Sequence, residues 1–465
     1  MSTVGSTREL SWALAGALVV FTACKRSPSA DAPPSASAPA PAAASVPSTP
    51  RPRCRALADH GFSATLGDRT TPDTGDGGAD EEVALPFSPE IGGGVALGSA
   101  FVVAATLPDK KGATAAAVVL SPGASASRTI DLGKVHGDVP PPRLAAAGEV
   151  LFAVVSDGAP HGSLARLARI EDAQNAPRVS WGAEVPQASD DSEALALEAG
   201  PSAVVLAWDE FDAKGERGVI RIVSMAPGDP KHAAPPLTVQ TEDDAEAPAV
   251  VRRAGGFWAA FLGRDARAAG DHAAVAPAPS GDPGDPGETL PTWVDVLPLD
   301  DAGKPAGAPR RVTPKEGHAQ SFDLAPLPNG DALVAYRDDR SVPGTSGGVV
   351  RLVTVHSSGS TDVRTVADED LGPGVPTLLA DTEPSRPTWL AFPSDGGVAR
   401  FLALDAEGRN RDTLGPETAI GTATLLAARG GRLLATRPHG KGVEALVFAC
   451  DPGRADAPAA SSASP

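Results

Sequence analysis

The sequence is poor in aromatic residues, sulfur and positive charge. Its 465 residues include 4% aromatic residues, one tyrosine, two methionines and three cysteines. Lys and Arg total 40 against 58 Asp and Glu, so the formal net charge is −18 at pH 7. Nucleic-acid binding needs clusters of Lys and Arg that neutralise phosphates, and this composition argues against it. The excess of carboxylates instead favours a cationic partner, metal ions or simple solubility.

Motifs of the common catalytic and nucleotide-binding sites are also missing. The chain contains no H-E-x-x-H, no phosphate-cradling G-x-x-x-x-G-K and no dinucleotide fingerprint. Gly344–Gly348 matches the G-x-S-x-G string of α/β-hydrolases, but no alternation of strand, turn and helix surrounds it. We interpret this segment as a glycine-rich hairpin turn, and we predict no catalytic residue.

The first 24 residues have the features of a bacterial export signal. Trp12–Ala23 is a run of twelve residues without a charge, which is long enough for a signal-peptide core and too short to span a membrane. The run ends in Phe21-Thr22-Ala23-Cys24, which resembles the lipobox of bacterial lipoproteins. This resemblance implies that residues 1–23 are cleaved and that Cys24 carries a lipid such as palmitate. An ordinary signal peptide with a chance cysteine is the alternative.

The residues after Cys24 fit a membrane tether. Residues 24–53 are rich in Ala, Pro and Ser, a composition that cannot bury a core and stays extended. No later segment reaches eighteen consecutive apolar residues, so the lipid is the only membrane attachment that we expect. We therefore predict a lipid-anchored protein of the cell envelope, at an outer membrane, facing the periplasm or the cell surface. Residues 454–465 are predicted to form a disordered tail.

The two remaining cysteines lie at opposite ends of the predicted folded body, residues 54–453. With Cys24 lipidated, Cys54 and Cys450 are left as a pair in an oxidising compartment. They form no C-x-x-C motif, and two cysteines so far apart make a poor zinc signature. We therefore predict a disulfide between Cys54 and Cys450.

A repeat runs through the body. Short runs typical of β-strands alternate with Gly, Pro and Asp, whereas long helical stripes of apolar residues are scarce. The clearest similarity joins Ser189–Ala194, which leads into Ala203–Trp208, with Glu242–Ala247, which leads into Phe257–Phe261. The central alanines of the apolar runs are Ala104, Ala153, Ala207, Ala260, Ala335, Ala391 and Ala435. Their spacings are 49, 54, 53, 75, 56 and 44 residues.

The longest spacing contains a low-complexity insertion, residues 264–288, and falls to 50 residues without it. A period near 50 with about four strands per unit resembles the β-propeller, although no kelch or tryptophan-aspartate signature is present. The predicted fold is therefore all-β, a propeller of about seven four-stranded blades. Two tandem β-sandwiches with coincidental spacing are the alternative, and six or eight blades are also compatible with the pattern.

The two ends of the body predict how the ring closes. After Ala435 only one more clear strand follows, Val443–Cys450, so the last blade lacks a strand. Residues 54–66 belong to no other unit and contain the apolar run Phe62–Leu66. If this N-terminal segment supplies the missing strand, antiparallel pairing places Cys54 beside Cys450, where a disulfide can form.

The segments that lead into the blades are acidic. Strands alternate in direction within a blade, so these segments all emerge on one face, near the mouth of the central channel. A ring of carboxylates there could hold Ca²⁺ or attract a cationic partner, although a chain of this charge carries carboxylates in most of its loops. The candidate residues of this acidic face are Asp190, Asp191, Glu193, Asp243, Asp244, Glu246, Asp368 and Asp370.

Two classes of function follow from these observations. The first is a membrane-anchored extracytoplasmic binding or scaffold lipoprotein whose partner is an envelope protein or a cationic ligand. The second is a propeller hydrolase or lyase that acts on envelope or extracellular glycans. The sequence favours the first class because it shows no catalytic pattern, and it indicates no certain cofactor other than a possible calcium ion.

Overall fold

The computed structural model describes most of the body, which belongs to one compact unit, Thr49–Pro465. Cys24 and the predicted signal and tether up to residue 52 lie outside the described residues, as does nearly all of the insertion. The described residues are 53–57, 63–66, 89–109, 112–122, 124, 126–136, 139–159, 162–186, 194–212, 214, 217–241, 243–265, 291–315, 317–338, 348–371, 375–393, 399–413, 423–439 and 442–451. No helix in these ranges has the length and hydrophobicity needed to span a bilayer.

The described residues form antiparallel sheets of the kind that the repeat predicted, and each sheet is one blade. The first blade contains β3 (Glu90–Leu97), β4 (Ala100–Asp109), β5 (Gly112–Leu120) and β6 (Arg128–Val135). The second contains β7 (Arg143–Ala147), β8 (Val150–Ala159), β9 (Gly162–Glu171) and β10 (Arg178–Pro186). The third contains β11 (Leu195–Ala199), β12 (Val204–Asp212), β13 (Arg217–Ala226), β14 (Asp229–Ala233) and β15 (Leu237–Thr238).

The remaining blades repeat this order. The fourth contains β16 (Asp244–Arg253), β17 (Gly256–Arg264), β18 (Thr292–Leu299) and β19 (Arg310–Arg311). The fifth contains β20 (Ala319–Pro326), β21 (Ala332–Asp338), β22 (Gly348–Val355) and β23 (Thr361–Leu371). The sixth contains β24 (Thr377–Leu379), β25 (Thr388–Pro393), β26 (Ala399–Leu404) and β27 (Asn410–Thr413). The seventh contains β28 (Thr424–Arg429), β29 (Arg432–His439), β30 (Gly442–Asp451), β1 (Arg53–Ala56) and β2 (Ser63–Leu66).

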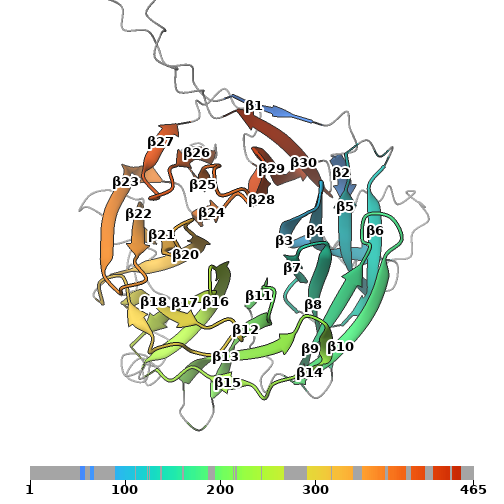
Figure 1. Ribbon diagram of the computed structural model, residues 1–465, viewed down its shortest axis with the longest axis horizontal. Helices are drawn as coiled ribbons and strands as arrows, with labels where there is room; N and C mark the ends of the chain where they lie inside the picture. Colours follow the sequence, from blue (N-terminus) through green and yellow to red (C-terminus); the bar gives the residue numbers. More distant parts are fainter. Residues whose placement is uncertain are drawn as a thin grey trace, which may run out of the picture. The chain divides into compact units, whose positions relative to one another are not determined.

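The seven blades form a closed ring, so the predicted seven-bladed β-propeller is confirmed (Figure 1). The first strand of each blade contacts the first strands of both neighbouring blades, in the order β3, β7, β11, β16, β20, β24, β28 and back to β3. These first strands therefore line the centre of the ring, and the later strands of each blade lie progressively further out. We call the end of the ring where the first strands begin the upper end, and the opposite end the lower end.

The hydrophobic core is divided among the interfaces between blades. Seven clusters of buried side chains are present in the described residues, one between each pair of neighbouring blades. The repeat alanines all lie on second strands and are buried, which explains their regular recurrence. A small side chain in this position allows neighbouring blades to approach closely while Val, Leu and Phe fill the remaining space. Burial of each such large side chain contributes about 1.5–3 kcal/mol.

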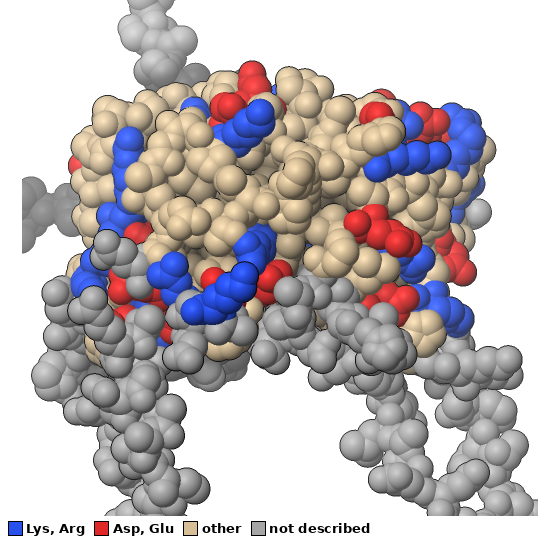
Figure 2. Space-filling view, turned by 90° about the horizontal axis from the view of Figure 1, so that it is seen from below, with Lys and Arg blue, Asp and Glu red and all other residues tan. Residues whose placement is uncertain are grey.

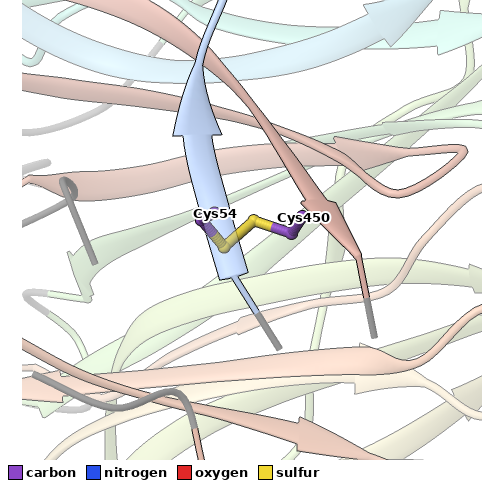
Figure 3. Close-up of a disulfide and its surroundings, with 2 residues drawn as sticks. All are labelled: Cys54 and Cys450. Atoms are coloured by element: carbon purple, nitrogen blue, oxygen red, sulfur yellow. A yellow bond between two sulfur atoms is a disulfide. The ribbon is translucent and has the colours of Figure 1, made fainter. Parts of the chain in front are cut away.

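The N-terminal segment closes the ring at the seventh blade. Both β1 and β2 pair antiparallel with β30, so two short strands supply what the sequence predicted as one. Cys54 lies directly opposite Cys450 in this pairing, with a Cα–Cα distance of 4.1 Å, and the two form the predicted disulfide (Figure 3). The sulfur bridge lies at the lower end of the ring, where β30 ends.

Candidate functional site

The centre of the ring contains two adjoining cavities. The upper cavity has a volume of about 580 Å³ and the lower cavity one of about 610 Å³, and Gly94, Val251 and Leu426 line both. Both volumes lie within the range of about 300–1,000 Å³ that is typical of small-molecule sites. Most residues around the two cavities are Gly, Ala, Leu, Val and Pro. A small number of charged side chains therefore decides the chemistry of the channel.

Arg143, the first residue of β7, lines the upper cavity. Its Nη1 donates a hydrogen bond to the carbonyl oxygen of Gly92 in the first blade. Its Nε is buried and has no hydrogen-bond partner among the described residues. Burial lowers the pKa of Arg143, and the negative charge of Asp323 opposes this effect. The guanidinium therefore keeps unused donor capacity inside the channel.

Asp323 lies on β20 and also lines the upper cavity. Its Oδ1 accepts the Leu324 N–H at 2.8 Å, and its Oδ2 accepts the Leu378 N–H of the sixth blade at 2.7 Å. Burial raises the pKa of Asp323 to about 6, although both N–H groups and Arg143 act to lower it. Asp323 thus joins the fifth and sixth blades and places a titratable carboxyl group in the channel.

Glu198, on β11, lines the lower cavity. Its Oε1 accepts the Ala199 N–H at 3.0 Å. Burial raises the pKa of Glu198 to about 7, while the Ala199 N–H and the charge of Arg252 act to lower it. This carboxyl group is therefore neutral in a substantial fraction of molecules near pH 7, and in that state it can donate a hydrogen bond.

Three arginines line the same lower cavity, namely Arg252, Arg253 and Arg386. The guanidinium of Arg253 already contacts other groups of the protein. Its Nε donates to the Phe257 carbonyl oxygen at 3.2 Å, and the guanidinium lies 4.7 Å from the Trp258 ring centroid. Arg386 has its Nε 3.6 Å from a carboxylate oxygen of Glu383. Arg252 is exposed at the strand end. The lower cavity therefore carries more positive than negative charge.

Three residues of the predicted acidic face, Asp243, Asp244 and Glu246, have partners within the fold. Asp243 forms an ion pair with Arg311 at 3.3 Å, and Glu246 pairs with Arg264. Oδ1 of Asp244 accepts the Gly218 N–H at 2.9 Å. The structure thus brings Asp243, Asp244 and Glu246 together at the start of β16. Asp190, Asp191 and Glu193 lie outside the described residues, and Asp368 and Asp370 lie within β23.

Charges of both signs are interspersed over the edge of the ring shown in Figure 2. Neither basic nor acidic side chains form a continuous patch on that surface. In the described part of the chain, no group of three or more His, Cys, Asp or Glu side chains is arranged to hold a metal ion. Among the described residues, the channel is therefore the best candidate for a binding site.

Sequence reasoning did not single out the charged residues of the channel. Arg143, Glu198 and Asp323 each stand beside apolar residues of a first strand, and Arg252 stands beside Arg253 at the end of another. A charged residue in such a position is usually assigned to a solvated face. The available signal was that each belongs to the first strand of a repeat. A charged residue in a strand that lines a channel can contact a ligand there, whereas one in an outer strand is better assigned to a solvated face.

Comparisons with known proteins identify a general likeness only. No family model matches the chain, and no curated protein matches it. An α-L-arabinanase from Penicillium chrysogenum complexed with arabinobiose is 12% identical, with 79% of this chain and 97% of that chain covered and a TM-score of 0.43. The propeller domain of the Trilobed protease from Pyrococcus furiosus, described as having an open velcro topology, is 9% identical, with 78% and 93% covered and a TM-score of 0.44.

A sialidase from Trypanosoma rangeli complexed with sialic acid is also similar. It is 10% identical, with 78% of this chain and 54% of that chain covered and a TM-score of 0.39. At such values the likeness carries no inference about activity or ligand. The function must be argued from the channel itself.

Proposed function

We propose that this protein is a membrane-anchored extracytoplasmic binding protein that takes a small ligand into its central channel. The channel carries this proposal, because it combines cavities of ligand size, a mostly apolar lining and a few convergent charged groups. Arg143 and Asp323 in the upper cavity, and Glu198 in the lower cavity, have pKa values that burial displaces. Displaced pKa values inside a cavity are typical of functional sites.

Two features support export and anchoring. The Cys54–Cys450 disulfide would persist in an oxidising compartment and would be reduced in most bacterial cytoplasms. The lipobox-like run that ends at Cys24 supplies a site for a lipid. In this proposal the lipid holds the protein at an envelope membrane, and the propeller presents its channel to ligands outside the cytoplasm.

A screen of small fragments by ligand-observed NMR tests binding in the channel. Val375 is 56% exposed and lines the upper cavity, and exposed Thr382 lines the lower cavity. Val375→Trp and Thr382→Trp should obstruct the respective cavities without disturbing buried side chains. We expect the wild type to bind fragments that one of the two variants no longer binds. Identical binding by all three proteins would contradict a channel site.

The acidic face forms a separate part of the proposal. We propose that the segments leading into the blades attract a cationic ligand, with Ca²⁺ as the test case. Binding to the folded state alone would raise the unfolding temperature in millimolar calcium. Replacing Asp190, Asp191, Asp243 and Asp244 by Asn should remove this rise. An unfolding temperature that calcium does not change would contradict the proposal.

One observation favours a second candidate function, a hydrolase or lyase acting on envelope or extracellular glycans. Glu198 and Asp323 are two carboxyl groups in one channel whose pKa values lie near 7 and 6. A carboxyl group that stays protonated near neutral pH can act as a general acid, and glycoside hydrolysis commonly uses two carboxyl groups. Release of reducing sugar from glycans by the wild type but not by Glu198→Gln would establish this activity. A binding protein would release none.

A further inference from the structure

We propose that the lower cavity binds a polyhydroxy carboxylate, such as a uronic acid, through the guanidinium groups of Arg252 and Arg386. This inference rests on the proposed function, because it names the class of ligand for the same channel. The cavity is built entirely from described residues. Its charged members come from the third, fourth and sixth blades, and the other blades contribute Gly, Ala, Val, Leu and Pro.

The acidic residues that line the lower cavity are Glu198 and Asp381, against three arginines. Asp381 also lines this cavity, but its carboxylate accepts backbone N–H groups of Gly430 at 2.8 Å and Gly431 at 3.0 Å. A further N–H, that of Glu383, donates to the same carboxylate at 2.9 Å. These donors occupy both oxygens of Asp381, which keeps its charge but forms no ion pair with an arginine of the cavity among the described residues. The three arginines still outnumber the two acidic residues, so the net positive charge of the cavity attracts an anion from solution.

Arg252 and Arg386 have donors to offer such an anion. No hydrogen-bond acceptor for the Arg252 side chain is found among the described residues, and its electrostatic partner is Glu198. The Arg386 guanidinium has one neighbouring carboxylate, that of Glu383, at 3.6 Å from Nε. Arg253 differs, since its three guanidinium nitrogens donate to the carbonyl oxygens of Phe257, Ala254 and Leu299. A carboxylate matches the fork of donors on a guanidinium.

The rest of the cavity suits a hydroxylated ring. Each first strand is the inner edge strand of its blade, so one row of its backbone N–H and C=O groups faces the channel without a partner strand. These groups can bind hydroxyls. Ala96, Leu327 and Leu379 add apolar surface, against which the C–H faces of a pyranose can pack. The carboxyl group of Glu198, when neutral, donates a further hydrogen bond to a ligand oxygen.

Three sugars with the same ring and different charge test the inference. We would measure binding of glucuronate, glucose and glucosamine to the oxidised protein by ligand-observed NMR at pH 6.5 and low ionic strength. We expect glucuronate to bind at least tenfold more tightly than glucose, and glucosamine to bind most weakly. Arg252→Gln combined with Arg386→Gln should weaken glucuronate binding at least tenfold.

Arg128→Gln is the matched control, because Arg128 is an exposed arginine of an outer strand that lines neither cavity. It should leave binding unchanged, and unfolding temperatures should verify that all variants fold. Glucose or glucosamine binding as tightly as glucuronate would overturn the inference, as would a double variant that binds like the wild type. If Thr382→Trp abolished this binding of glucose or glucosamine, the channel would remain a ligand site and only the choice of an anionic ligand would be wrong. Absence of binding by all three sugars would also overturn the inference, and the fragment screen would then decide the proposed function separately.

Discussion

At the scale of single residues, two of the buried tryptophans described in this propeller donate their indole N–H to an acidic neighbour. The indole N–H of Trp208 donates to Glu210 at 3.1 Å, and that of Trp293 donates to Asp295 at 2.9 Å. In a strand, residues two apart lie on the same side, so the acid two positions later meets the indole. Trp389 has Ala391 in the equivalent position, and its buried N–H has no partner among the described residues.

This difference predicts unequal effects of the same substitution. Trp208→Phe removes the donor to Glu210, whose side chain is only 6% exposed. Trp389→Phe instead removes a donor that has no acceptor in the part of the chain that the structure describes. Both variants lose similar volume. We expect Trp208→Phe to lower the free energy of unfolding by about 1–2 kcal/mol more than Trp389→Phe does. Urea denaturation of the two variants measures this difference, and equal losses would contradict the explanation.

The raised pKa of Glu198 predicts a pH dependence of stability. Its pKa is about 7 in the folded protein against 4.5 for an unperturbed glutamate. Between these values the unfolded chain gives up the proton and the folded protein keeps it, so stability falls as pH rises from 4.5 to 7. Above pH 7 the full cost of the buried charge is present. Below pH 4.5 the group contributes no pH dependence.

Glu198→Gln should remove this part of the pH dependence. Relative to the wild type, the variant should gain about 1–3 kcal/mol in the free energy of unfolding between pH 5 and pH 8. Urea denaturation at both values provides the measurement. Asp323 titrates in both proteins, so its contribution cancels in the comparison. If the difference between variant and wild type were the same at both pH values, the carboxyl group of Glu198 would not be perturbed by burial.

At the scale of elements, carboxylate side chains connect neighbouring blades by accepting their backbone N–H groups. Asp209, on β12, accepts the Ala194 N–H before β11 at 3.2 Å and the Ala247 N–H of β16 at 3.0 Å. Asp323 and Asp381 make similar links from the fifth to the sixth blade and from the sixth to the seventh. Such links satisfy backbone groups that the change from one sheet to the next leaves unpaired.

The seam of the seventh blade yields a prediction about the disulfide. Replacing both Cys54 and Cys450 by Ala should lower the free energy of unfolding by about 2–5 kcal/mol, because the bridge closes a very long loop in the unfolded chain. Both cysteines are buried, and β1 and β2 still pair with β30, so the variant should fold. Thermal unfolding of the double variant and the oxidised wild type provides the comparison.

Chemical mapping supplies an independent check of the same seam. Proteolysis of the unreduced wild type should release the Cys54 and Cys450 peptides joined to each other. The single variant Cys54→Ala should leave Cys450 as a free thiol. If both thiols of the folded, air-oxidised wild type reacted with iodoacetamide, the bridge would be absent in solution.

At the scale of the whole molecule, stability is distributed around the ring. Each blade buries one face against the blade before it and the other against the blade after it, through a separate hydrophobic cluster. No blade can bury both faces alone, so an open ring would expose two apolar faces and the unpaired edge of β30. Closure by the N-terminal strands and the disulfide therefore matters to every blade.

The lipid predicted on Cys24 is tested on the full-length protein. Expression in a bacterial host with labelled palmitate should label the wild type, and Cys24→Ser should remove the label. The wild type should fractionate with membranes, whereas the variant should be released or remain unprocessed. Cys54→Ala serves as a control for the loss of a cysteine and should label normally. Equal labelling of Cys24→Ser and wild type would contradict lipidation at this position.

The sequence by itself predicted a repeat of about seven β-blades and the place where the ring closes, and the structure decided that there are seven blades rather than six or eight. These features repeat or are local. An alanine recurs about every 50 residues, on what the structure shows to be second strands. The last repeat lacks a strand in the sequence, and Cys54 and Cys450 lie near the two ends of the body, where that strand would be supplied. A periodic pattern arises because each blade must solve the same packing problem with its own residues. Antiparallel pairing then placed Cys54 opposite Cys450 without further information.

Only the tertiary structure decided which charged residues belong to the candidate site. Arg143 and Asp323 are 180 residues apart in the chain and influence each other because seven first strands converge on one channel. The pKa of Glu198 is displaced by burial that other blades create, and no local pattern in Leu195–Ala199 reports it. Burial and electrostatic fields depend on all neighbouring atoms in space. The ring itself therefore converts ordinary strand residues into the charged lining of a channel.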